Sequence, residues 1–174
     1  EHHPSSPPTI KQHLAAIRML FDYLVSGGIL TFNPAASVRG PKHVVKVGKT
    51  PVLTAEEMRE LFDVIDTNTI IGLRDRALIG VMVYSFARVS AVIKMKSSDY
   101  YERGRRSWFR LHEKGGRFHE VPVHHTAEAY VDAYLKVSGL DQTPSAPLFQ
   151  SIAGRSKLLT GNALSRSDVL ATVK

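Results

Sequence analysis

Two cations in the middle of the chain have residue types and surroundings suited to holding a phosphate group. Arg88 interrupts a long apolar run that includes Leu78 before it and Val92 after it. Lys114 stands in the tract Lys-Gly-Gly-Arg, at the root of a predicted hairpin. An arginine fork donates to two phosphate oxygens at once, and a lysine ammonium supplies a second charge or a proton. Arg88 and Lys114 could therefore bind an anion together at a fixed position.

Both cations also have ordinary structural interpretations. Arg88 could be a surface arginine whose aliphatic stem covers apolar neighbours. The Lys-Gly-Gly-Arg tract could be only a turn, since glycine supplies the positive φ that tight hairpins need. We expect this tract to serve in both ways, as a turn through its backbone and as a phosphate ligand through Lys114.

The charge of the chain favours a polyanionic partner. Its 174 residues include 23 Lys and Arg against 16 Asp and Glu, which gives a net charge of +7 and a pI of about 9.8. Residues 94–117 hold eight basic and three acidic residues. Residues 33–53 hold four basic residues and no acid, namely Arg39, Lys42, Lys46 and Lys49. Such clustering is typical of nucleic-acid binding, although a merely solvated surface gives the same totals.

The composition also excludes several classes of site. The absence of cysteine rules out a Cys-ligated zinc site and a thiol nucleophile, and it fits a reducing compartment. No apolar stretch approaches the ~18 residues of a membrane span, and the N-terminus does not resemble a signal peptide. His124 and His125 are adjacent, so we expect their rings to point to different faces and not to share a metal. We predict a cytoplasmic protein without a cofactor and without a membrane partner.

Local patterns predict one helix near the N-terminus, followed by a basic linker. From Thr9, apolar residues recur on one helical face until Gly27 and Gly28 supply a stop. One amphipathic helix cannot bury its face alone. We therefore expect it to lie on the later domain or to belong to a small helical domain whose earlier helices are absent. Residues 33–53 contain prolines and glycines without a helical period, which predicts a linker and a domain boundary.

The remainder predicts an α+β fold that is mainly helical and contains a small three-stranded antiparallel sheet. Thr54 and Glu57 have the spacing of a capping box and predict a helix start. Helices follow over about 72–85 and 89–96, and strands over about 99–102, 107–113 and 118–123. A further helix begins at Thr126 and ends at Gly139. Residues 140–162 are predicted as a loop with a short buried piece, and a last helix begins at about Ala163.

Four blocks of this sequence, taken in order, resemble the tyrosine recombinase (phage integrase) family. The family's segment around its first catalytic arginine is similar to GLRDRALIGVMVYSFARVSAVIKMKSSDY, with Arg88 at the matching place. Its hairpin with the catalytic lysine is similar to HEKGGRFHEVPV, with Lys114 matching. The last helix of its core-binding domain and the following linker resemble IKQHLAAIRMLFDYLVSGGILTFNPAASVRGPK. The start of its catalytic domain resembles LTAEEMRELF.

The resemblance implies a domain organisation. Residues 1–40 would be the C-terminal part of a helical, SAM-like core-binding domain, and residues 41–53 a basic linker. Residues 54–174 would be the N-terminal part of the recombinase catalytic domain.

The resemblance also implies a reaction and a partner. In that family two domains clamp duplex DNA, and a tyrosine attacks a backbone phosphate to leave a 3′-phosphotyrosyl link and a free 5′-hydroxyl. Two arginines and a histidine hold the phosphate, and the hairpin lysine protonates the leaving oxygen. Arg88 and Lys114 would be the catalytic residues of this chain. The predicted DNA contacts are Arg39, Lys42, Lys46, Lys49 and Arg117. The complete protein would act as a tetramer on DNA, and a monomer is the alternative for this chain alone.

Two departures from the family pattern affect these expectations. The family usually has an acidic residue three positions after the arginine, and here that place holds Ala91, so Arg88 is held less firmly or by another group. The sequence contains no His-x-x-Arg, and none of its tyrosines lies downstream of such a motif. Residues 163–174 resemble the helix that precedes this motif in the family. The chain thus looks cut before the nucleophile and should not cleave DNA by itself.

Three hypotheses follow. The first is a DNA-binding fragment of a tyrosine recombinase, an integrase of a mobile element or a chromosome-dimer resolvase. The second is a naturally truncated, non-catalytic DNA-binding or regulatory relative, which the reading frame after Lys174 would distinguish. The third is a helical interaction module whose positive charge is incidental, which a salt titration of DNA binding would test.

Overall fold

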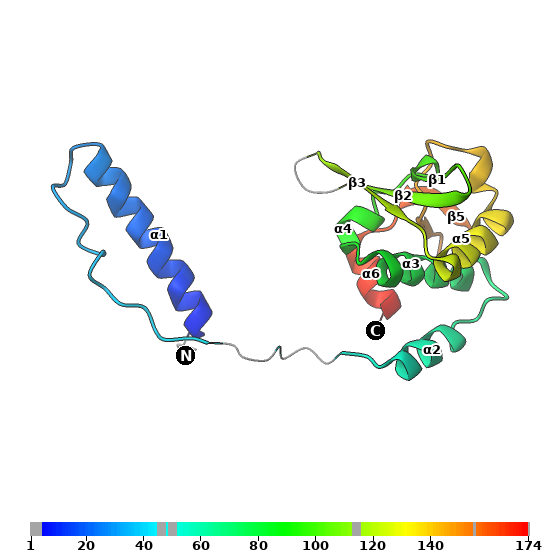
Figure 1. Cartoon of the computed structure of the whole chain (residues 1–174), viewed down its shortest axis with the longest axis horizontal. Helices are drawn as coiled ribbons and strands as arrows, with labels where there is room; N and C mark the ends of the chain where they lie inside the picture. Colours follow the sequence, from blue (N-terminus) through cyan, green and yellow to red (C-terminus); the bar gives the residue numbers. More distant parts are fainter. Residues whose placement is uncertain (1–4, 45–47, 49–51, 113–115, 155, 174) are drawn as a thin grey trace. The chain divides into compact units, whose positions relative to one another are not determined.

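The computed structural model describes residues 5–44, 48, 52–112, 116–154 and 156–173. The chain divides into two compact units, Glu1–Val52 and Leu53–Lys174, and each is described by itself (Figure 1). Among the described residues, no helix combines the length and the apolar content that crossing a bilayer requires.

The first unit is built on one long helix, α1 (Pro7–Ser26). It begins two residues earlier than predicted, because Pro7 and Pro8 occupy first-turn positions whose N–H groups would lack partners anyway. It ends where predicted, with the N–H of Gly27 bonded to the carbonyl of Tyr23 at 2.9 Å. None of its residues is buried within the unit. The apolar face predicted from the sequence is therefore present but only partly covered there, with Leu14, Phe21 and Leu24 half-buried.

The segment after α1 folds back along the helix. Asn33 donates its side-chain amide to the carbonyl of Arg18 at 3.0 Å and to Asp22 Oδ1 at 2.6 Å. The Arg18 guanidinium in turn donates to the carbonyls of Ala35, at 3.2 Å, and Val38. These polar bonds hold the beginning of the predicted linker against α1, with Ala35 as the buried contact.

The second unit begins with the predicted capping box. Glu57 N donates to Thr54 Oγ1 at 3.2 Å and Thr54 N donates to Glu57 Oε2 at 2.7 Å, which confirms the start of α2 (Ala55–Asp63). Thr69 caps α3 (Ile70–Ser85) through the N–H of Gly72. Half of the 16 residues of α3 are buried, so this helix is the centre of the unit.

After α3 come the short α4 (Val89–Val92), the 3-10 turn η1 (Ser97–Asp99) and the predicted three-stranded antiparallel sheet. Its strands are β1 (Tyr100–Arg103), β2 (Arg106–His112) and β3 (Phe118–Pro122), in the order β1-β2-β3. Next come α5 (His125–Ser138), the 3-10 turn η2 (Leu140–Gln142) and α6 (Arg166–Val173). Figure 1 shows the sheet lying over α3 and α5.

One core joins these layers. Leu78 and Val81 of α3 are fully buried, with Phe109 of the sheet and Tyr134 of α5. The Tyr134 ring stacks on Phe149, with 6.2 Å between ring centroids. Only one of the two adjacent aromatic residues of β2 faces inward, because Phe109 is 1% exposed and Trp108 lies on the outer face.

The prediction of a loop over residues 140–162 is wrong in part. This segment contains η2 and most of a second sheet, formed by β4 (Gln150–Ile152) and β5 (Leu159–Ala163). The Gln150 side chain organises it by accepting from the N–H of Gly161 at 2.8 Å, and Arg74 of α3 donates to the Gln150 carbonyl at 2.9 Å. Because Ala163 pairs with β4, α6 begins three residues later than expected.

The helix predicted over 89–96 is also too long. α4 ends at Val92, with Ile93 N donating to the Val89 carbonyl at 3.0 Å as the last helical bond, because the residues after Ile93 pair with a distant segment. The Met95 carbonyl accepts from Leu148 N at 2.8 Å, and Lys96 forms a bridge with Pro147. Met95 is fully buried as a result.

Candidate functional site

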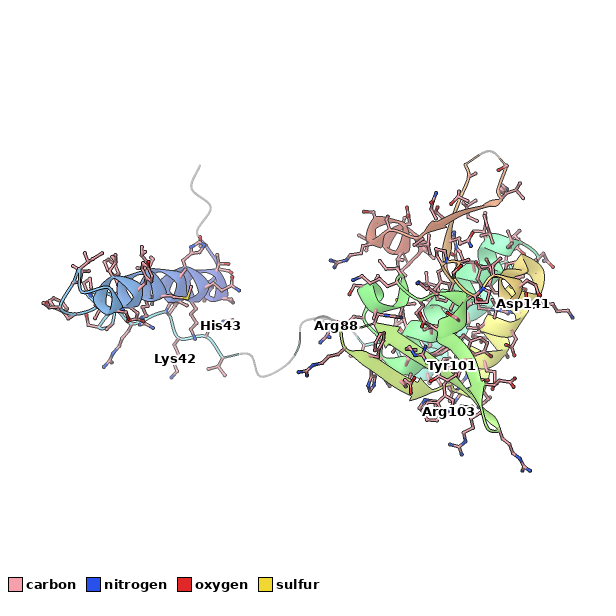
Figure 2. All side chains as sticks on the ribbon, turned by 90° about the horizontal axis from the view of Figure 1, so that it is seen from above. Lys42, His43, Arg88, Tyr101, Arg103 and Asp141 are labelled. Atoms are coloured by element: carbon pink, nitrogen blue, oxygen red, sulfur yellow. The ribbon has the colours of Figure 1, made fainter. Side chains whose placement is uncertain are left out.

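Arg88 lies at a corner between two helices. α3 ends at Phe86, whose backbone is left-handed with φ 53°, and Arg88 is the extended residue that precedes the first turn of α4. The Arg88 carbonyl accepts from the N–H groups of Ala91, at 2.8 Å, and Val92, at 3.2 Å. The residue is exposed, and Figure 2 shows it at the margin of the second unit. The apolar run thus fixes the backbone of Arg88 but does not bury its side chain.

Ala91, three positions after Arg88, has a packing role in this chain. It is 5% exposed and belongs to the core cluster of the second unit. A carboxylate at this place would lose its hydration inside an apolar core. The third residue after Arg88 is therefore used for packing in this chain.

The β2–β3 hairpin has the predicted pairing on both sides of its loop. Residues pair from Trp108 opposite Pro122 to His112 opposite Phe118. Gly116 has φ +75°, in the left-handed region that favours glycine, and Arg117 is exposed. Lys114 lies outside the described residues, so its convergence with Arg88 on one phosphate stays a prediction.

The first unit gathers basic side chains around a surface hollow of about 570 Å³. Its lining includes the predicted Arg39 and Lys42, and also Lys11 and Arg18 of α1. Figure 2 shows Lys42 on the segment that runs beside α1. Lys11 and Arg18 were missed from the sequence, although a spacing of seven residues places them on one helical face. Lys46 and Lys49 lie outside the described residues.

The outer face of the three-stranded sheet holds two arginines on aromatic rings. Arg103 lies over Trp108, 4.1 Å from the ring centroid, and Arg110 lies 4.9 Å from the centroid of Tyr101. Both arginines pair with Glu120 at 3.2 Å, and this hydrogen bond raises the pKa of Arg110. Figure 2 shows Arg103 apart from Arg88. This face is therefore partly neutralised and separate from the Arg88 corner.

The adjacent histidines depart from expectation. The ring centroids of His124 and His125 lie only 4.1 Å apart, so the rings do not point to different faces. His124 stacks on Tyr84 and accepts from Thr126 N at 3.2 Å, which makes it the cap of α5. In the part of the chain that the structure describes, no three His, Cys, Asp or Glu side chains are grouped to hold a metal ion.

Residues 51–174 match the phage integrase family. Similar curated proteins are tyrosine recombinases. One is XerC of Myxococcus xanthus, which is 30% identical over 168 residues, covering 92% of this chain and 54% of that protein. Another is XerC of Vibrio atlanticus, which is 31% identical over 147 residues, covering 84% of this chain and 46% of that protein.

Solved structures share the fold at low sequence identity. The tetramer of lambda integrase bound to a Holliday junction gives a TM-score of 0.62 at 18% identity, over 92% of this chain and 44% of that one. The XerH recombinase bound to difH gives 0.60 at 18% identity, over 97% of this chain and 47% of that one. The chain spans about half the length of the relatives it matches. With more than half of its residues matched by one family, the chain belongs to the phage integrase family of tyrosine recombinases.

Proposed function

We propose that this chain is the DNA-binding part of a site-specific recombinase that cuts and rejoins duplex DNA through a 3′-phosphotyrosyl intermediate. The observation that carries the proposal is the Arg88 corner, where a packed core fixes the backbone of a cation and leaves its side chain exposed. Two solved structures with this fold are recombinases bound to DNA substrates, which supports DNA as the partner here.

The chemistry that these residues suit is phosphoryl transfer. Arg88 donates to the non-bridging oxygens, where negative charge accumulates in the transition state. A deprotonated tyrosine oxygen bonds to phosphorus, the bond to the 5′ oxygen breaks, and Lys114 gives that oxygen a proton. Donors placed in advance at such a centre commonly contribute ~10²–10³ each in rate. Each of the two cations would therefore act mainly in the transition state.

The remaining predicted residues would bind the DNA backbone. We assign this role to Arg39, Lys42, Lys46, Lys49 and Arg117, with residues 1–40 as part of a core-binding domain and residues 41–53 as the linker. Lys11 and Arg18 extend the basic surface around the same hollow. The complete protein would be cytoplasmic and act as a tetramer on paired sites, whereas this chain would bind DNA as a monomer.

The nucleophile would come from outside this sequence, so this chain alone would bind DNA without cleaving it. The reading frame after Lys174 separates this proposal from a shortened regulatory relative. A continuation into His-x-x-Arg and a tyrosine supports the recombinase, and a stop codon there supports the regulator.

DNA binding by this chain can be tested by fluorescence anisotropy with a labelled duplex over a series of salt concentrations. About six phosphate contacts should give a log–log slope near −5. A flat response would contradict both DNA-binding proposals and leave only an interaction module.

The role of Arg88 can be tested with R88A in the complete recombinase. We expect R88A to keep the unfolding free energy of the parent and to lose strand cleavage and rejoining. The reason is that the variant removes an exposed cation, whereas other residues hold the backbone at this position. R59A is the matched control, since Arg59 is an exposed arginine of α2 in a pair with Glu56. If R88A unfolds and a hydrophobic replacement restores the fold, then Arg88 is structural.

A further inference from the structure

One arginine of α1 fastens the segment that follows this helix, residues 33–42, which we call the return segment. Arg18 Nε donates to the Ala35 carbonyl at 3.2 Å, and Arg18 Nη2 donates to the Val38 carbonyl. A guanidinium presents its donors in a rigid fork, so one side chain can hold two carbonyls of a passing backbone. Ala35 is 5% exposed at this contact. Arg18 therefore uses donors within the protein to hold the return segment in place.

An uncharged side chain holds the beginning of the return segment. Asn33 Nδ2 donates to the Arg18 carbonyl at 3.0 Å and to Asp22 Oδ1 at 2.6 Å, and Ala35 N donates to Asn33 Oδ1 at 2.8 Å. Asp22 lies one helical turn after Arg18, a spacing at which an arginine and a carboxylate often pair. Here the carboxylate accepts from Asn33, and the guanidinium donates to backbone carbonyls. Asn33 thus secures the return segment without carrying a charge.

The return segment meets α1 again at Gly40. A side chain at Gly40 would begin 3.4 Å from Leu14 Cδ2 and 3.5 Å from Lys11 Cγ, so this stretch of backbone lies directly against the helix. Leu14 is half-buried. Arg39 precedes Gly40 and Lys42 follows it by two residues. The contact therefore fixes the backbone from which both cations project, beside Lys11.

The consequence is a basic hollow that two elements build together. Lys11 of α1 and Arg39 and Lys42 of the return segment are exposed and line the hollow of about 570 Å³. Asp22 is the only acidic residue between positions 2 and 53, and it is bonded to Asn33. Clustered cations of this kind attract an anionic ligand. The hollow is complete only while the return segment lies against α1.

We propose that Arg18 and Asn33 are positioning residues for DNA phosphate binding, which hold the return segment so that Arg39 and Lys42 join Lys11 in one phosphate-binding hollow. The inference rests on the proposed function, in which Arg39 and Lys42 contact the DNA backbone. Arg18 and Asn33 act through the bonds that hold the return segment. Neither of them needs to contact a phosphate.

The test uses variants that keep the net charge of the chain, so that a lost phosphate contact cannot be explained by a removed cation. R18K keeps the charge, but its single nitrogen cannot place two donors as the guanidinium fork does. N33A removes the three bonds of Asn33 and no charge. Each variant binds a labelled random-sequence duplex over a series of salt concentrations, and the log–log slope is measured.

The reference is the variant R39A/K42A, which should reduce the magnitude of the slope by about 1.8, the value of two phosphate contacts. R18K and N33A should each reduce it in the same direction, up to that limit. R59K and Q12A are the matched controls, because Arg59 is an exposed arginine of α2 and Gln12 is an exposed uncharged residue of α1. Both controls should keep the slope of the parent.

A combined variant separates positioning from a direct contact. If Asn33 acts only through the two cations of the return segment, then N33A should change nothing further when it is added to R39A/K42A. A further loss in that background would overturn the inference, because the asparagine would then act on another part of the interface.

The remaining outcomes separate the inference from the proposed function. An unchanged slope for R39A/K42A contradicts the DNA-binding role of these two residues, and the inference falls with it. A normal effect of R39A/K42A together with a parent-like slope for R18K or N33A overturns the inference alone. Circular dichroism checks the helix content of each variant. Should R18K lose helix content, N33A decides alone, because it leaves every residue of α1 unchanged.

Discussion

The two longest helices of the molecule are used in opposite ways. α1 has 20 residues and buries none of them within its unit, whereas α3 has 16 residues and buries half. α1 is held to its following segment by polar bonds through Arg18 and Asn33, and α3 by apolar packing on α5 and the sheet. Burial of apolar surface is the main stabilising contribution in folding. The second unit therefore provides the rigid frame, and the first provides mainly a basic surface.

The largest expected effect tests this comparison directly. L78A should cost about 2–5 kcal/mol of unfolding free energy, because Leu78 is fully buried in α3. L20A is the matched control in α1, where Leu20 is 57% exposed, and it should change stability by no more than about 0.5 kcal/mol. Urea unfolding followed by circular dichroism measures both. Equal losses would mean that α1 is packed as firmly as α3.

A smaller effect is expected at the helix starts. T54A removes both the acceptor for Glu57 N and half of a capping box, and should cost about 1 kcal/mol. S6A is the counterpart in α1, where Ser6 makes no side-chain bond to the helix backbone. Its cost should be smaller, as measured in the same unfolding experiment. A larger loss of unfolding free energy for S6A than for T54A would contradict this comparison, since it would mean that the helix start of the first unit is capped more strongly than that of the second.

The smallest effect depends on pH. The N–H and the hydroxyl of Ser165 lower the pKa of Asp168 from its usual 3.8. The carboxylate therefore stabilises the start of α6 above pH 3.8, and this contribution is lost as pH falls through the lower folded-state value. Because Asp168 is exposed, solvent screens the effect.

Thermal unfolding of the parent and of D168N over a pH series measures this contribution. The two should differ at neutral pH and become equal in acid. α1 has no acidic residue in its first turn and offers no such contribution. A difference that persists unchanged in acid would show that the side chain acts by something other than its charge.

Local signals explain what the sequence could predict. The capping box at Thr54, the end of α1 at Gly27 and the three strands depend on residues close together in the chain, and all were predicted to within a few residues. β4 and β5 were missed, and length is not the reason, because β1 and β3 are four and five residues long and were predicted. Their pairing depends on the Gln150 side chain and on Arg74, which lies 76 residues away in sequence.

The sequence could indicate which residues belong to the candidate site, but not how these residues lie in space. Arg88 was identified from its flanking sequence, yet its exposure depends on the corner between α3 and α4. The Asp99–His112 bond joins positions 13 residues apart, and the pairing of β1 with β2 brings them together. Neither residue carries a sequence pattern of its own that would have indicated the contact.

The backbone of Phe86 has a consequence for how Arg88 is aimed. Phe86 is 93% exposed and left-handed, a conformation that costs a bulky L-residue roughly 1–2 kcal/mol. Glycine would remove that cost, but it would also let the corner sample many more backbone angles. Compared with glycine, an aromatic residue here lowers the stability of the fold but also narrows the range of backbone angles at the corner. The guanidinium two residues later thus follows a backbone position that allows fewer angles than glycine would.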